Sequence, residues 1–170
     1  FISSKKIWCA SSTHFNEEKL CGLTHKKLKE KYKNVLTIII PRHIERTDII
    51  KDELSKLNLL VHEHESKKKI NKNTDIYIVN SYGQTKSIYN ICKNVFLGGS
   101  LIKHGGQNPL EATRYGCNIL HGPNTDNFKE IYEYLDRLKV SIKINNTSQM
   151  IRGLNKFFLK NDNSKKIKLK

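Results

Sequence analysis

The chain has 170 residues and a formal net charge of +15, from 31 Lys and Arg against 16 Asp and Glu. This length fits one domain of ordinary size, and a hydrophobic share of 37% excludes a long disordered polyelectrolyte. No stretch approaches the roughly 20 consecutive apolar residues that a membrane-spanning helix needs. The chain opens on Phe1 without an initiator Met, and we expect it to be a segment of a longer protein.

Short apolar runs rich in β-branched residues alternate along the chain with longer amphipathic segments, which predicts strands and helices in turn. The expected strands are 6–10, 36–40, 59–62, 75–79, 95–97, 118–121 and 140–144. The expected helices are 17–33, 47–57, 84–92, 109–115, 128–138 and 147–159. We interpret residues 1–159 as the domain and residues 160–170 as a basic, disordered tail.

Repeated strand–helix alternation predicts an α/β fold: a Rossmann-like parallel sheet with helices on both faces. In such open sheets, ligands bind beyond the carboxyl ends of the strands. The loops that follow the strands therefore become the candidate site. They are residues 11–16, 41–45, 80–83, 98–108 and 122–127, and they hold nearly every unusual residue of the chain.

The glycine-rich loop at residues 98–108 is the segment richest in functional signals. Its two Gly pairs, Gly98-Gly99 and Gly105-Gly106, allow close approach of the backbone, and their N–H groups can point at anionic oxygens. It contains neither a G-x-G-x-x-G nor a P-loop pattern, so a dehydrogenase-type dinucleotide site is not supported.

Two interpretations of Glu111 are equally compatible with the sequence. Asn108 is a good helix N-cap and Pro109 suits the first helical position, so Glu111 can return to the Asn108 N–H and complete a capping box. Alternatively, its carboxylate can accept hydrogen bonds from both hydroxyls of a ribose, beside a phosphate at the helix start.

Two further loops carry candidate ligands for an anion. Arg42 and His43 follow a buried strand, where the guanidinium can bind a phosphate and the imidazole can add a hydrogen bond. The alternative for Arg42 is a surface ion pair with Glu45 or Asp48. Residues 12–14 (Ser-Thr-His) offer hydroxyls after the first strand, although a simple helix cap explains them nearly as well.

Other signals are weaker. The His-Glu-His-Glu run at residues 62–65 has no second half and is not expected to bind metal. The four cysteines lack a Cys-x-x-Cys pair, so we expect reduced, buried thiols in a cytosolic setting. They are Cys9, Cys21, Cys92 and Cys117.

Taken together, these motifs resemble the lipid A Kdo transferases (3-deoxy-D-manno-octulosonic acid transferases). The resemblance lies in Ser-Thr-His at 12–14, Pro-Arg-His at 41–43, Gly-Gly-Ser-Leu at 98–101, His-Gly-Gly-Gln-Asn-Pro-Leu-Glu at 104–111 and Gly-Pro-Asn-Thr-Asp-Asn-Phe at 122–128. It covers nearly the whole chain and corresponds to the C-terminal half of those enzymes.

The resemblance implies the C-terminal, donor-binding domain of a GT-B glycosyltransferase, an inverting enzyme of Gram-negative bacteria. Such enzymes transfer Kdo from CMP-Kdo to a lipid A precursor in lipopolysaccharide biosynthesis, at the cytoplasmic face of the inner membrane. No metal, other cofactor or nucleic acid is implied. The N-terminal acceptor domain would supply the general base, so we expect the isolated chain to bind CMP-Kdo or CMP without catalysing transfer.

Carried onto this sequence, the resemblance implies no catalytic residue but an extended donor site. Its members are Ser12, Thr13, Arg42, His43, Tyr82, Gly83, Gly98, Gly99, Ser100, His104, Gly105, Gly106, Asn108 and Glu111. The backbone amides around 98–100 and 104–106 would bind the phosphate and the sugar carboxylate. Two departures stand out: Asn80 and Gln84 replace the family's usual carboxylates, and Asn16 stands near a usual Gly, where Asn tolerates the left-handed region.

Two alternatives remain open at this stage. One is a GT-B domain of a UDP-sugar transferase or an epimerase, because the sequence does not reveal the base that is bound. The other is a basic module that binds nucleic acid or an anionic membrane through charge alone, in which case affinity would fall steeply with salt.

Overall fold

The computed structural model describes residues 4–67 and 69–168, with side chains up to residue 160. All the expected elements are present. The strands are β1 (Lys6–Thr13), β2 (Val35–Pro41), β3 (Val61–Glu63), β4 (Ile76–Ile78), β5 (Asn94–Leu97), β6 (Asn118–His121) and β7 (Ser141–Lys143). The helices are α1 (Glu17–Lys31), α2 (Thr47–Lys56), α3 (Thr85–Ile91), α4 (Leu110–Arg114), α5 (Lys129–Arg137) and α6 (Thr147–Lys168), with short 3₁₀ turns η1 (Ile44–Arg46) and η2 (Asp126–Phe128).

The described strands form one sheet in the order β3-β4-β2-β1-β5-β6-β7, and every pairing is parallel. From β1 the chain builds toward one edge through β2, β3 and β4, and then crosses to β5 on the other side of β1. The strand order therefore reverses between β1 and β5. Ligands of open α/β sheets bind at such a switch point.

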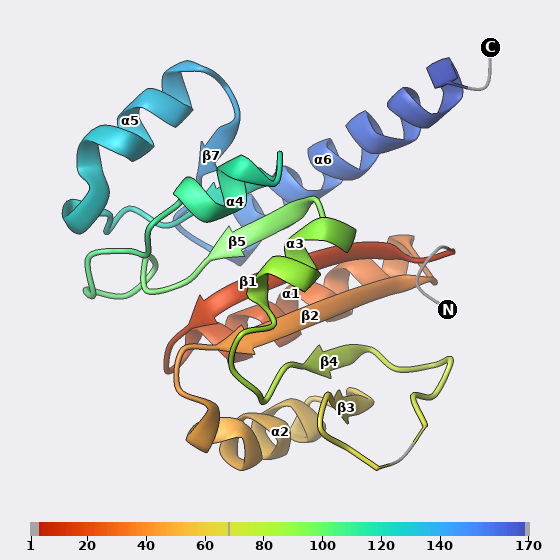
Figure 1. Ribbon diagram of the computed structural model, residues 1–170. Coiled ribbons are helices and arrows are strands. Elements are labelled where there is room, and N and C mark those ends of the chain that lie inside the picture. The colour runs from red at the N-terminus through yellow and green to blue at the C-terminus, as the bar shows by residue number, and fades with distance from the viewer. Residues whose placement is uncertain (1–3, 68, 169–170) are drawn as a thin grey trace.

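Helices cover both faces of this sheet, which confirms the predicted fold class (Figure 1). Successive side chains of a strand point to opposite faces. Trp8 and Ile39 therefore belong to the core under α1, α2 and α6, whereas Cys9 and Ile38 belong to the core under α3, α4 and α5. Both cores are apolar and fully enclosed, so burial of their side chains is the main favourable term that holds the layers together.

The last helix is longer than expected. The sequence places its end at Leu159 and a disordered tail at residues 160–170, but α6 continues to Lys168. No Pro or Gly follows Gly153, so nothing in residues 154–168 interrupts the backbone hydrogen bonds of a helix. Residues 169 and 170 lie outside the described part.

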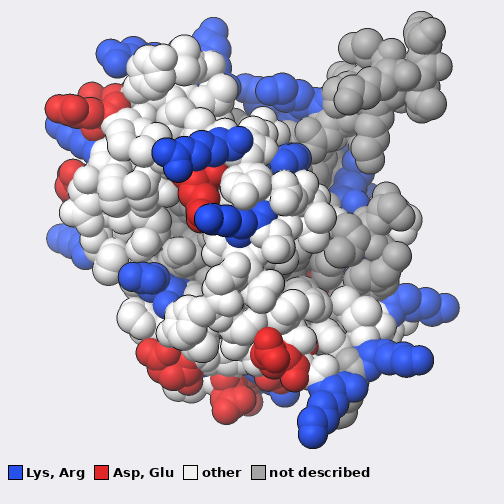
Figure 2. Space-filling view, viewed as in Figure 1, with Lys and Arg blue, Asp and Glu red and all other residues white. Residues whose placement is uncertain are grey.

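The four cysteines are buried free thiols, as expected. In the face shown in Figure 2, Lys and Arg lie around the rim and also near the centre of the upper half, and Asp and Glu gather along the lower edge near α2, with others at the upper left and beside the central basic side chains. This face therefore carries no single basic patch. None of the helices in the described residues has the length and apolar character needed to cross a bilayer.

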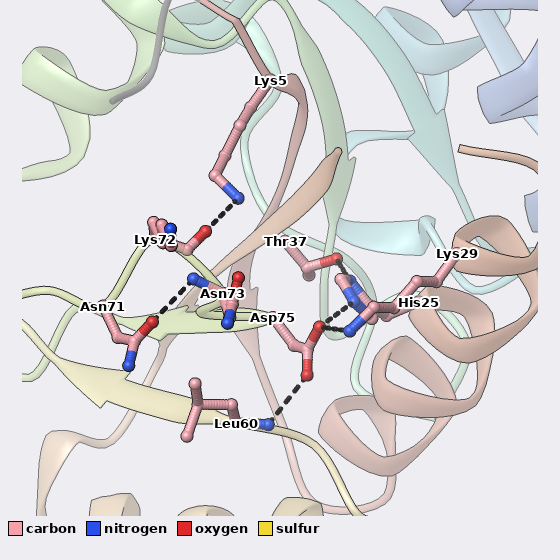
Figure 3. Close-up of polar contacts among 9 residues, drawn as sticks. All are labelled: Lys5, His25, Lys29, Thr37, Leu60, Asn71, Lys72, Asn73 and Asp75. Atoms are coloured by element: carbon pink, nitrogen blue, oxygen red, sulfur yellow. Dashed lines mark hydrogen bonds and ion pairs between the residues drawn. The ribbon is translucent and has the colours of Figure 1, made fainter. Parts of the chain in front are cut away.

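A buried network of hydrogen bonds and ion pairs links the amino-terminal end of β4 to α1 and β2 (Figure 3). The His25 ring lies 2.9 Å from the Thr37 hydroxyl and 3.2 Å from Asp75 Oδ1, while Lys29 also pairs with Asp75. Asp75 Oδ2 accepts a hydrogen bond of 2.9 Å from the Leu60 N–H. The Thr–His–Asp arrangement resembles a catalytic triad, but Thr37 is fully buried, so the network is structural.

Candidate functional site

The loops after β1 and β5 meet at the switch point. A bulge interrupts the pairing of β1 with β2 between Ser11 and Thr13, and Ser12 adopts a φ of 55°. A positive φ is costly for a residue other than Gly, so the surrounding structure holds Ser12 in place. The loop ends at Asn16, whose φ of 71° confirms that this Asn takes the left-handed conformation expected of it.

A pocket of about 380 Å³ opens beside this bulge. Its lining residues are Ser12, Thr85, Tyr89, Leu97, Gln107, Asn108, Leu110, Glu111 and Arg114. We call it the Glu111 pocket. It brings together three of the predicted donor residues, Ser12, Asn108 and Glu111, and adds apolar surface with Leu97 and Leu110.

The Glu111 carboxylate takes no part in a capping box. Asn108 Oδ1 accepts a hydrogen bond of 3.0 Å from the N–H of Leu110, the first residue of α4, but the N-cap position falls on Pro109 and not, as predicted, on Asn108. Among the described residues, however, nothing donates a hydrogen bond to the half-buried carboxylate of Glu111. An unpaired carboxylate that lines a pocket is available to a ligand, and this favours the ribose interpretation.

Next to the pocket lie three histidine rings from three different loops. The ring centroids of His14 and His104 are 4.1 Å apart, and those of His14 and His43 are 5.8 Å apart. We call these three residues the imidazole cluster. Gln107 connects it to the Glu111 pocket, because Gln107 lines the pocket and its Nε2 lies 3.4 Å from His14 Nε2.

The electrostatics of the imidazole cluster favour an anion. Burial lowers the pKa of His14 to about 4, and the neighbouring His104, His43 and Arg42 act in the same direction. His14 is therefore neutral near pH 7, held among groups that repel added positive charge. A bound anion would reverse this balance, because it would favour the protonated rings.

Arg42 lies close enough to the imidazole cluster to act on His14, and its guanidinium has no carboxylate partner in the described part of the chain. Its expected surface partner Glu45 instead lies 3.3 Å from His43 Nδ1. The exposed guanidinium is therefore free to bind an anion, while the Arg42 backbone N–H donates to the Thr13 carbonyl at 2.9 Å and ties the loop to β1.

Most of the backbone amides predicted to bind the donor are hydrogen-bonded within the protein. The N–H groups of Gly99, Ser100 and Leu101 donate to the carboxylate of Glu17, at 2.7 to 3.2 Å. The other amides with partners bond to carbonyls: Gly98 to Ser11, His104 to Ile102 and Gly106 to Gly99. The structure thus corrects the expectation for the amides of Gly98, Gly99, Ser100, His104 and Gly106, because the protein's own groups already occupy them. For the Gly105 N–H no acceptor is found among the described residues, so its role at the donor stays a prediction.

The remaining predicted residues lie apart from the pocket. The Thr13 side chain is fully buried, with no partner for its hydroxyl. Tyr82 is 69% exposed, and neither it nor Gly83 lines the Glu111 pocket. Asn80, which replaces a usual carboxylate, accepts a hydrogen bond of 3.0 Å from the Glu65 N–H and so has a local structural role.

Several residues of the site are absent from the prediction. Thr85, Tyr89, Gln107 and Arg114 line the pocket, yet each is ordinary in sequence. Glu17 directly follows the loop after β1, and its position in the first turn of a helix suggests only a favourable interaction with the helix dipole. His14 carried a signal as part of the Ser-Thr-His run. No group of His, Cys, Asp and Glu suited to a metal ion is found among the described residues.

Fold and site together define a Rossmann-like α/β domain with the Glu111 pocket and the imidazole cluster at its topological switch point. No family model matches the chain. It is 34% identical over 147 residues to a 3-deoxy-D-manno-octulosonic acid transferase of Haemophilus influenzae, and these residues make up 86% of this chain and 34% of that protein. The corresponding enzyme of Aquifex aeolicus is 26% identical over 145 residues, 85% of this chain and 40% of that protein.

The chain is therefore homologous to the 3-deoxy-D-manno-octulosonic acid transferases, and it spans about a third of the length of these curated relatives. Its fold matches the crystal structure of the C-terminal CMP-Kdo binding domain of WaaA from Acinetobacter baumannii, with a TM-score of 0.89 at 23% identity, over 97% of this chain and 86% of that one. The trehalose-6-phosphate synthase OtsA shares the fold more distantly, with a TM-score of 0.58 at 10% identity, over 91% of this chain and 36% of that one.

Proposed function

We propose that this chain is the donor-binding domain of a glycosyltransferase that transfers Kdo from CMP-Kdo to a lipid A precursor. Homology to enzymes named as Kdo transferases supports the reaction, and the likeness to a domain described as CMP-Kdo binding supports the donor. The observation that carries the proposal is the unpaired Glu111 carboxylate in a pocket beside the imidazole cluster.

The two parts of the site suit the two parts of CMP. Glu111 would accept hydrogen bonds from the ribose hydroxyls, with Asn108 and Ser12 on the same wall of the pocket. The phosphate and the Kdo carboxylate would lie toward Arg42 and the imidazole cluster. Because the Arg42 guanidinium can supply the positive charge that a phosphate needs, we infer that binding requires no metal ion, so EDTA should leave affinity unchanged.

Transfer itself would require a second domain. The described site offers groups that bind and orient a donor, and positioning of an acceptor needs the other wall of a cleft. We propose that an N-terminal acceptor domain of the same protein supplies the general base and binds the lipid A precursor, at the cytoplasmic face of the inner membrane. The chain alone should then bind CMP-Kdo without turnover.

Isothermal titration calorimetry with CMP and UMP at equal ionic strength tests the proposal. We expect CMP to bind and UMP to bind more weakly. Preference for UMP would instead indicate a UDP-sugar enzyme. Affinity that falls steeply with salt and does not distinguish CMP from adenosine monophosphate would indicate a charge-driven module. Either result would overturn the proposal.

A further inference from the structure

Glu17 is a fully buried carboxylate at the start of α1, in the centre of the candidate site. Its Oε2 accepts hydrogen bonds from the N–H groups of His14, at 3.0 Å, and Gly99, at 2.7 Å. Its Oε1 accepts from Ser100, at 3.2 Å, and Leu101, at 3.1 Å. One side chain thus joins the loop after β1 to the loop after β5.

This arrangement is an anion site that the protein fills with its own anion. Successive N–H groups of a glycine-rich turn converge to form a concavity that suits a phosphate or carboxylate. Here the concavity holds Glu17. The contact is close enough to require a glycine at position 98, because a Cβ atom there would lie 2.8 Å from Glu17 Oε2 and 2.5 Å from the Ser12 carbonyl oxygen.

Retaining a charge at this position is costly. The pKa of Glu17 is raised, because burial outweighs the four backbone hydrogen bonds, which act in the opposite direction and offset part of the cost of desolvation. A carboxylate has two oxygens that accept only, so it can satisfy all four N–H groups. The amide of a glutamine has one oxygen and would direct an NH₂ group at two of the donors. The geometry therefore needs the carboxylate.

The two loops that Glu17 joins carry the ligand-facing groups. His14 belongs to the first loop, and its own N–H is one of the four donors. The second loop leads to His104 and Gln107, and the backbone of Gly99 packs against both of them and against His14. A Cβ atom at position 99 would lie only 3.2 to 3.3 Å from these three side chains. Movement of the glycine-rich loop would therefore separate the rings of the imidazole cluster.

We propose that Glu17 is a positioning residue for the donor site: it binds no ligand, but it fixes the glycine-rich loop so that His14, His104 and Gln107 face the phosphate. This inference rests on the proposed function for the identity of the ligand. The contacts of Glu17 themselves stand independently of it.

The test compares Glu17→Gln with Asp75→Asn, a control that removes a buried carboxylate at the other end of the sheet. Both variants are studied well below their melting temperatures, with CMP affinity, amide hydrogen exchange and histidine NMR titrations as readouts. In Glu17→Gln we expect CMP affinity to fall by about tenfold or more, faster exchange at Gly99 and Leu101, and a changed pKa of His14. Asp75→Asn should melt earlier but keep its affinity within about twofold.

Equal loss of affinity in both folded variants would overturn the proposal, because Glu17 would then affect CMP binding only through the stability of the protein. Unchanged affinity in folded Glu17→Gln would overturn it as well. If Glu17→Gln does not fold, Glu17→Asp takes its place, since it keeps both acceptors on a shorter side chain. Failure of both to fold would show a purely structural role and would also contradict the proposal.

The readouts separate this inference from the proposed function. A parent protein that does not bind CMP would refute the proposed function alone. The hydrogen-exchange and histidine titrations of the parent and Glu17→Gln would still show whether Glu17 fixes the loop. Unchanged exchange and an unchanged pKa of His14 in the folded variant would then refute the positioning role on its own.

Discussion

The rings of His14 and His104 lie with their centroids 4.1 Å apart, although one residue follows β1 and the other follows β5. The parallel pairing of these two strands brings their following loops, and with them the two rings, to the same edge of the sheet. The contact therefore depends on the topological switch of the sheet, and it places two titratable groups where a ligand of such folds would bind.

Anion binding at this cluster should be accompanied by proton uptake. The pKa of His14 is lowered to about 4 in the free protein, by burial and then by His104, His43 and Arg42. A negative ligand raises the pKa of His14, so the complex holds more protons than the free protein, and affinity rises as pH falls from neutral toward the free-protein value of about 4. The methyl ester of CMP is a suitable probe, because its phosphodiester does not titrate in this range.

Calorimetry in two buffers of different ionisation enthalpy measures this uptake directly. His14→Gln should reduce the uptake and flatten the dependence of affinity on pH. Affinity that stays constant across the range, with no proton exchanged in either buffer, would remove the imidazole cluster from the ligand site.

Glu111→Ala should weaken CMP binding and leave the fold intact. Nothing in the described chain donates a hydrogen bond to the Glu111 carboxylate, so its loss should change the free energy of unfolding by less than about 0.5 kcal/mol. The loss of hydrogen bonds between a ribose and a charged group should cost about 1.5–3 kcal/mol of binding, or roughly tenfold to a hundredfold in Kd. Calorimetry and urea unfolding give the two quantities.

Glu133→Gln is the matched control, because Glu133 is exposed on α5 and outside the pocket. It should bind CMP as the parent does. A folded Glu111→Ala variant with parental affinity would show that the Glu111 carboxylate makes no contact with the ligand.

Asp75→Asn should destabilise the protein by about 3–5 kcal/mol, the usual cost of breaking a buried charged pair. Burial alone would raise the pKa of Asp75, but hydrogen bonds from His25, Lys29 and the Leu60 N–H hold it well below its ordinary value. The stabilisation is therefore complete above the unfolded-state pKa of about 4 and is lost as pH falls below it. Urea unfolding at several pH values should show the parent and the variant converging in acid.

A difference in stability that persists unchanged below about pH 3 would show that the charge of Asp75 is not the source of the effect. In that case the packing of His25 and Thr37 would account for it.

Gly98→Ala should also destabilise the protein, by about 1–3 kcal/mol. Its Cβ atom would meet the Ser12 carbonyl oxygen at 2.5 Å and the Thr13 Cα at 2.7 Å, and the backbone cannot easily yield there. Gly22→Ala provides a comparison, since its nearest contacts are the flexible ends of leucine side chains. Thermal unfolding should give the larger loss at Gly98. The opposite order would show that the two loops can separate at little cost.

The sequence predicts the fold well because its signals are local. The β-branched run that becomes β2 and the Asn108-Pro109 start of α4 specify their elements within a few residues. The end of α6 is less determined, because no breaker residue marks it. The parallel sheet then follows from strand–helix alternation.

The site is only partly predictable, because its contacts join distant segments. The glycines at 98 and 99 indicate amides that bind an anion, but the sequence does not reveal that the anion is Glu17 of the same chain. Similarly, the same sequence pattern is compatible with a Glu111 side chain that completes a capping box and with one whose carboxylate stays free, so the sequence alone does not decide between them. The pairing of β1 with β5 decides which groups meet.

Binding of a cytidylate across the Glu111 pocket and the imidazole cluster can be tested by NMR chemical-shift mapping of the folded chain with CMP. We expect saturable changes at Ser12, Asn108 and Glu111, together with shifts of the His14 and His104 rings, and few changes around Asp75. Spectra that remain the same in millimolar CMP, or changes confined to the lysine-rich surface, would contradict it.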